Sequence, residues 1–89
     1  MALHVEVVSP ERILYSGEAE MVVCRSEGGD IAFLTGHAPF VGTLGAGEVR
    51  VQQVEGGDVR ANVEGGFVEV RDNRVVILSD QAELVDAAG

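Results

Sequence analysis

Apolar and polar residues alternate along most of this chain, and this period of two restricts its fold more than any other feature. Near the N-terminus, Leu3, Val5 and Val7 are separated by polar residues. Such a segment presents its apolar side chains on one face of a strand, whereas an amphipathic helix needs them every three to four residues. The helical period is absent until the tail, where residues 82–88 are expected to hold one helical turn. The chain is therefore predicted to be all-β.

Turn-forming residues divide the alternating pattern into short segments. Many short strands at intervals of about 8–12 residues are typical of a β-sandwich or flattened barrel. With 89 residues and neither a linker nor an internal repeat, residues 1–89 are expected to form a single two-layer antiparallel β-sandwich domain. The expected strands are Leu3–Val7, Arg12–Tyr15, Glu18–Arg25, Ile31–Leu34, Val41–Leu44, Glu48–Val54, Val59–Glu64, Phe67–Arg71 and Arg74–Ser79.

The same alternation predicts which side chains form the core. Valine favours pleated surfaces and supplies most of the inward positions. The predicted core consists of Val5, Val7, Met21, Val23, Val49, Val51, Val63, Val68, Val70 and Ile77.

The register of two hairpins follows from the pattern. A two-residue turn at Asp72-Asn73 matches Val70 with Val75, with the arginines on either side of the turn opposite each other. At Gly56-Gly57 a two-residue turn sets valines against polar residues, so a three-residue loop with a glycine at positive φ is favoured. That loop pairs Val51 with Val63 or Ala61.

The hairpin around Asp72-Asn73 is apolar on both faces. Its second face carries Phe67, Val76 and Leu78. A hairpin that is buried on one face needs apolar side chains on that face only. Either another layer or a partner protein is therefore expected to cover the second face.

Composition excludes several classes of partner. The chain has 15 acidic residues against six basic ones, all of them arginine, for a net charge of −9. Phosphate backbones and anionic lipids attract clustered Lys and Arg, so binding to nucleic acid or to such lipids is disfavoured. No stretch reaches the ~18 apolar residues of a membrane-spanning helix, which predicts no direct membrane insertion. A soluble cytosolic protein is expected, with docking on a membrane complex left open.

The single cysteine, Cys24, cannot form an internal disulfide, which fits a reducing compartment. It lies in an alternating run and is predicted to act as a small buried hydrophobe.

The segment Ser26–Phe40 contains the most tightly specified loop, Gly36-His37-Ala38-Pro39. Gly36 is free to adopt positive φ, Pro39 fixes its own φ, and the residue before proline is held extended. The segment therefore suggests a surface built to meet a partner.

The sequence contains no recognisable reaction centre. His37 lacks a neighbouring nucleophile or acid pair at a known spacing, so it is expected to hold the loop by hydrogen bonds to backbone. The two histidines and the cysteine lack a metal-ligand spacing, and the glycine pairs fit turns better than phosphate loops. No catalytic residue, metal ligand or cofactor is predicted.

The order of four segments nevertheless resembles a known family. These segments are VVSPERILYSGEAEMVV, SEG, GHAPFVGTLGAGEVRV and EGGFVEVRDNRVVILSD. Together, from Leu3 to about Glu83, they resemble the N-terminal domain of the epsilon subunit of bacterial F-type ATP synthase, which is called delta in mitochondria. The resemblance implies a β-sandwich of about ten strands, and the C-terminal helical hairpin of the family is absent from these 89 residues.

The resemblance also implies a non-catalytic stalk role at the cytoplasmic face of the membrane. Such a subunit binds gamma, contacts the ring of c subunits and turns with the rotor, coupling proton flow to ATP synthesis. Contact with the c-ring is expected at Glu27, Gly28 and Asp30. Phe40 is expected to be the main apolar contact with gamma. The full gamma surface is expected to comprise His37, Pro39, Phe40, Val41, Thr43, Val76 and Leu78.

Two other functions remain as alternatives. A small-ligand-binding sandwich would need an aromatic-lined cleft, for which one Tyr and three Phe are few. A small enzyme would need His37 beside a carboxylate in a concave pocket.

Overall fold

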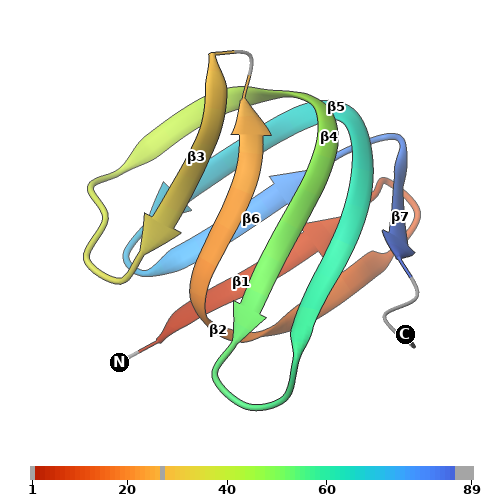
Figure 1. Cartoon of the computed structure of the whole chain (residues 1–89). Coiled ribbons are helices and arrows are strands. Elements are labelled where there is room, and N and C mark those ends of the chain that lie inside the picture. The colour runs from red at the N-terminus through yellow and green to blue at the C-terminus, as the bar shows by residue number, and fades with distance from the viewer. Residues whose placement is uncertain (1, 27, 86–89) are drawn as a thin grey trace.

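The computed structural model describes residues 2–26 and 28–85, which form seven β-strands (Figure 1). Among the described residues there is no helix that is long and apolar enough to cross a membrane. The strands are β1 (Leu3–Val8), β2 (Ile13–Ser26), β3 (Gly29–Leu34), β4 (Phe40–Gln53), β5 (Asp58–Arg71), β6 (Arg74–Leu78) and β7 (Ala82–Val85).

The strands form a flattened barrel that closes on itself. The hydrogen-bonded order is β1-β6-β5-β4-β2-β3, β1 also pairs with β2, and β7 pairs with β5. Three strands, β2, β4 and β5, are 14 residues long and bend from one layer into the other (Figure 1). Each layer therefore contains five strand segments, and the two together contain the expected ten.

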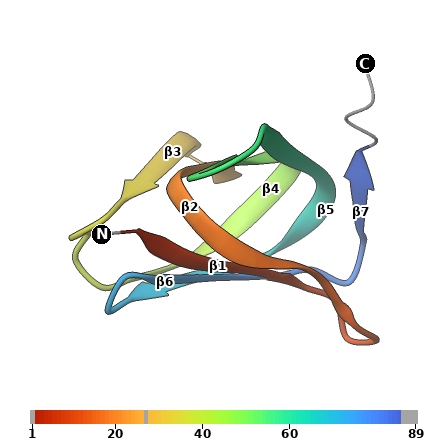
Figure 2. The ribbon, with the colours of Figure 1, turned by 90° about the horizontal axis from the view of Figure 1, so that it is seen from below.

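In the first layer, β1 and β6 lie between the N-terminal part of β2 and the C-terminal part of β5, which pairs with the start of β4. The second layer contains β3, the remaining parts of β2, β4 and β5, and β7. Figure 2 shows the layers edge-on, with β1 and β6 in the lower one. The β-sandwich is confirmed, with one exception to its antiparallel pairing, because β1 and β6 are parallel.

The long strands bend at glycines where the sequence suggested turns. β4 and β5 keep one register across the bend, since Leu44 pairs with Gly66 and Ala46 pairs with Glu64. Gly65 and Gly66 have φ of 113° and 136°, which a residue with a Cβ rarely adopts. A Cβ on Gly66 would also collide with the backbone of Leu78 and lie 3.0 Å from Cα of Ser79. These glycines therefore bend the hairpin without ending it.

Eight of the ten predicted core residues are buried, and the other two are only half-buried. Met21 and Val23 are half-buried, whereas Val22 and Cys24 point inward. The cause is an irregularity in the β2–β4 pairing between Ala19 and Met21. One extra residue in a strand reverses the faces of the side chains that follow it. The correct residues are Val5, Val7, Val49, Val51, Val63, Val68, Val70 and Ile77.

One of the two hairpin registers is confirmed and the other is wrong in its loop length. Val70 pairs with Val75 across a two-residue turn whose residues, Asp72 and Asn73, have φ of 51° and 60°. The other loop has five residues, because Gln52 pairs with Asp58, and Val51 pairs with Val59 in place of the predicted Val63 or Ala61. The valines still share one face, since the predicted and observed loop lengths are both odd, and Gly56 has the expected positive φ.

One other local expectation, the helical turn over residues 82–88, is wrong where the structure describes it. In the tail, residues 82–85 form β7, which pairs with β5, in place of the expected helical turn. Residues 86–88 of that expected turn lie outside the described residues.

Cys24 is a buried free thiol, as predicted. Burial, with a smaller contribution from the charge of Asp30, raises the pKa of Cys24 from 9.0 to about 11. Two pKa units lower the reactive thiolate fraction about a hundredfold below pH 9. Alkylation by iodoacetamide at pH 8 should thus be at least about a hundredfold slower in native buffer than in denaturant, as followed by mass spectrometry. Equal rates would mean that Cys24 is accessible in the fold.

Candidate protein–protein interface

The outer face of the first layer carries an uninterrupted row of side chains across five strands. Each residue in this row pairs with the next through the strand register. We call it the outer apolar row, and it consists of Thr43, Phe67, Leu78, Val8 and Ile13. At the usual strand separation of about 4.8 Å, it extends over roughly 19 Å.

The large side chains of this row are open to solvent. Ile13 is 58% exposed, Phe67 is 56% exposed and Leu78 is 43% exposed. A parallel row two residues further along the strands adds Val41, which is 71% exposed, and the half-buried Val76. Glu69 and Glu6 alternate with these two valines. A contiguous apolar patch with polar neighbours is typical of a protein contact surface.

The structure brings together four of the residues that the sequence assigned to the gamma contact: Val41, Thr43, Val76 and Leu78. Phe67, Val8 and Ile13 belong to the same surface but were not among the residues assigned to the gamma contact. For Phe67, the signal in the sequence was the hairpin around Asp72-Asn73, which is apolar on both faces. The parallel pairing that places Val8 beside Leu78 has no local signal in the sequence.

Phe40, the expected main contact, lies on the opposite side of its strand. It pairs with Val70, packs against the core and lies 5.5 Å from Phe33 between ring centroids. Because strand side chains alternate between faces, Phe40 points inward while Val41 points out. Phe40 is therefore a half-buried ring packed on the core, and Phe67 is the large ring on the outer face.

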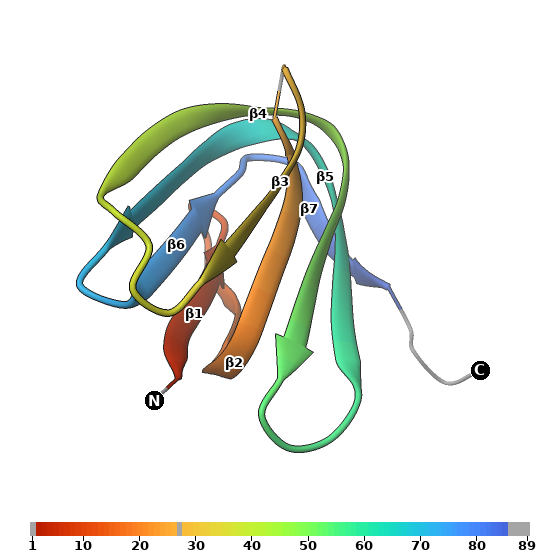
Figure 3. The ribbon, with the colours of Figure 1, turned by 60° about the vertical axis from the view of Figure 1, so that its left-hand side comes forward.

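The loop of residues 35–39 crosses the open side of the sandwich between β3 and β4 (Figure 3). The half-buried His37 stacks edge-on against Phe33, with ring centroids 5.0 Å apart. Its Nδ1 lies 2.7 Å from the carbonyl oxygen of Ala38 and donates to it, and its backbone N–H donates to Leu34. These bonds confirm the prediction that His37 holds the loop, while Pro39 is exposed beside it.

The hairpin between β2 and β3 carries the residues expected to meet the c-ring. Gly28 and Asp30 are exposed at its tip, and Glu27 lies outside the described residues. Ser26 Oγ donates to the Gly29 carbonyl and accepts the Gly28 N–H, which orders the turn. Asp30 forms an exposed ion pair with Arg25 at 3.2 Å. The tip belongs to the second layer and is therefore separate from the outer apolar row.

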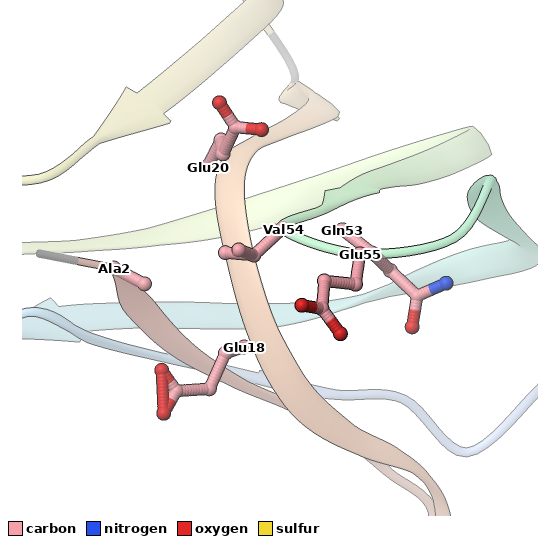
Figure 4. A pocket seen from close by; sticks show the side chains of 6 residues that line it. All are labelled: Ala2, Glu18, Glu20, Gln53, Val54 and Glu55. Atoms are coloured by element: carbon pink, nitrogen blue, oxygen red, sulfur yellow. The ribbon is translucent and has the colours of Figure 1, made fainter.

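One hollow on the surface has an acidic lining. It is lined by Ala2, Glu18, Glu20, Gln53, Val54 and Glu55 (Figure 4). Its lining contains no aromatic ring, and the side chains of Glu18 and Glu20 point apart. Within residues 2–26 and 28–85 there is no group of three His, Cys, Asp or Glu that could hold a metal ion. This hollow therefore lacks the aromatic lining that a small-ligand-binding sandwich would need.

Comparison with known proteins gives one consistent result. Residues 2–85 match the family described as ATP synthase, Delta/Epsilon chain, beta-sandwich domain. The chain is 48% identical over 86 residues to the ATP synthase epsilon chain of Micrococcus luteus, covering 97% of this chain and 94% of that one. It is 45% identical over 84 residues to the epsilon chain of Streptomyces griseus, covering 94% of this chain and 68% of that one.

Solved structures agree with the fold. A chain in the Euglena gracilis mitochondrial ATP synthase assembly of OSCP, F1 and c-ring has a TM-score of 0.88 at 20% identity, covering 99% of this chain and 56% of that chain. A chain in the Tetrahymena thermophila mitochondrial central stalk and c-ring assembly has a TM-score of 0.73 at 15% identity, covering 93% and 66%. The family match extends over nearly the whole sequence, and this chain accordingly belongs to the delta/epsilon family of ATP synthase subunits and forms its β-sandwich domain.

Proposed function

We propose that this chain is a non-catalytic rotor subunit in the central stalk of a proton-translocating F-type ATP synthase. In this role it binds gamma through the outer apolar row, contacts the c-ring through the tip of the β2–β3 hairpin, and helps to couple proton flow to ATP synthesis. It works peripherally at the cytoplasmic face of the membrane. Its relatives are named ATP synthase epsilon chain, which supports this role.

The observation that carries the gamma contact is the exposure of the outer apolar row. Phe67 and Leu78 are adjacent in register, and both are more than two-fifths exposed. Large apolar side chains at the centre of an interface dominate its binding energy once water is excluded. Because the three central strands of the row, β1, β6 and β5, are hydrogen-bonded to a neighbour on both sides, little backbone conformational entropy is lost on binding.

Replacing Phe67 and Leu78 together with serine should weaken binding to gamma by about 2 kcal/mol or more, because both contacts are lost. The unfolding free energy of the free domain should change little, since both side chains already face water. The matched control is Leu34→Ser with Val54→Ser, two comparably exposed apolar residues outside this face. Calorimetric titration of gamma, with circular dichroism of each free variant, measures both quantities. Equal affinities for the two double variants would place the interface elsewhere.

The tip of the β2–β3 hairpin should act through charge. Rim charges alter encounter rates and salt dependence more than final affinity. Replacing Glu27 and Asp30 together with lysine should slow association with a complex of gamma and c-ring by about tenfold at low salt. The difference should shrink at high salt.

The control for the tip variant is Glu55→Lys with Glu83→Lys. It changes the net charge by the same amount at two exposed positions that lie outside the hollow containing Asp30. Stopped-flow measurement at two salt concentrations compares the two variants. The c-ring assignment is wrong if they slow association equally, or if neither does.

A further inference from the structure

The loop of residues 35–39 has one hydrogen bond that joins it to a distant part of the chain. The backbone N–H of Gly36 donates to Oδ1 of Asn73 at 2.7 Å. Two further hydrogen bonds of this loop, both made by His37, stay within residues 34–38. Figure 3 shows the loop beside the turn between β5 and β6, where Asn73 lies. Since an N–H can bond only to an acceptor, the oxygen of the carboxamide must face Gly36.

Asn73 is well placed to hold another segment because its own position is fixed. It is half-buried in a two-residue turn closed by the pair Arg71 and Arg74. Its backbone carbonyl accepts the N–H of His4 at 2.9 Å, which ties the turn to the start of β1. The carboxamide is therefore presented from a turn that two neighbouring strands hold in place.

The turn itself does not require the side chain of Asn73. Both central residues have positive φ, and glycine is strongly preferred at the second of them because it adopts this conformation without strain. Asp-Asn is a less favourable pair for such a turn than Asp-Gly. The bond to Gly36 supplies a reason for asparagine at this position.

We propose that Asn73 is a positioning residue that fixes the Gly36–Pro39 loop for binding to gamma. This inference rests on the proposed gamma contact, to which the sequence also assigned His37 and Pro39. The exposed Val41 lies two residues after Pro39, and it begins the row that continues through Glu69 to Val76. If the loop loses its bond to Asn73, fewer molecules hold the binding conformation, and the apparent affinity falls by that fraction.

Two substitutions separate this role from a structural one. Asn73→Gly removes the acceptor and leaves the favoured Asp-Gly turn, so the free domain should unfold at the same urea concentration as the wild type or a higher one. Asn73→Asp keeps an acceptor oxygen and tolerates positive φ. We expect Asn73→Gly to bind gamma about three- to tenfold more weakly, the range for one lost hydrogen bond, and Asn73→Asp to restore the wild-type affinity.

Amide hydrogen exchange of Gly36 in the free domain tests the bond without gamma. Exchange should be slow in the wild type and in Asn73→Asp, and faster by about tenfold in Asn73→Gly. Unchanged exchange in Asn73→Gly would overturn the inference. The inference would also be overturned if Asn73→Gly bound gamma as tightly as the wild type does. It would be overturned as well if Asn73→Gly lost both affinity and stability and Asn73→Asp did not restore the affinity. Failure of the wild type to bind gamma would instead overturn the proposed function, and with it the binding role of Asn73.

Discussion

Replacing Val70 with aspartate is expected to abolish the cooperative unfolding transition of this domain. Val70 is 1% exposed and is paired with Phe40 on one side and Val75 on the other. A carboxylate there would be buried among apolar side chains with no cation facing it, at a cost of several kcal/mol. A small domain has a total stability of only about 5–15 kcal/mol, so the folded state should be largely lost. Thermal and urea unfolding followed by circular dichroism measures this.

The matched control for that experiment is Val41→Asp. It makes the same chemical change on an adjacent strand, but Val41 is 71% exposed and faces outward. Its unfolding free energy should stay within about 0.5 kcal/mol of the wild type. A normal transition in Val70→Asp, or equal losses in the two variants, would contradict the assignment of inner and outer faces in the first layer.

Replacing Gly66 with alanine is expected to cost at least about 3 kcal/mol of unfolding free energy. Gly66 has φ of 136°, and an added Cβ would collide with the backbone of Leu78 and Ser79. Backbone cannot move aside as a flexible side chain can, so β5 and β6 would have to separate at the bend. Urea unfolding of the variant gives the size of the loss.

Gly45→Ala provides the comparison for Gly66→Ala. A Cβ on Gly45 would find only the carbonyl oxygen of Ser26, at an ordinary 3.8 Å, and its φ is not in the positive region. The loss there should be below about 1 kcal/mol. Similar losses at both glycines would mean that the close approach of β6 to the bend of β5 is not what makes Gly66 necessary.

The sequence predicted best those features that depend on neighbouring residues. The hairpin around Asp72-Asn73 was predicted in full because its turn residues tolerate positive φ and its strands alternate without interruption. The prediction failed for Met21 and Val23, because one extra residue before them reverses the faces and leaves no mark on the local composition. A glycine in a sequence is compatible either with a turn that ends a strand or with a bend inside a strand, and neighbouring residues do not distinguish the two.

The candidate interface was predicted only in part, because alternation along one hairpin can be predicted from neighbouring residues whereas pairing between distant strands cannot. Val41, Thr43, Val76 and Leu78 were assigned correctly to one outer face, since each follows from alternation within a hairpin. Val8 and Ile13 join that face only through the parallel pairing of β1 with β6, which depends on the closure of the whole barrel. Phe40 was assigned from its size and its neighbour Pro39, which carry no information on the direction of its side chain.

Hydroxyl-radical footprinting of side chains, with and without purified gamma, tests the central claim most directly. It compares oxidation at exposed apolar residues on different parts of one molecule, without any substitution that could disturb the fold. We predict that gamma protects Phe67, Leu78 and Ile13 from oxidation by at least about fivefold, because they are desolvated together at the centre of the interface. Leu34 and Val54, which are equally open in the free domain, should react as before. Protection of Leu34 or Val54 with no change at Phe67 and Leu78 would contradict the account.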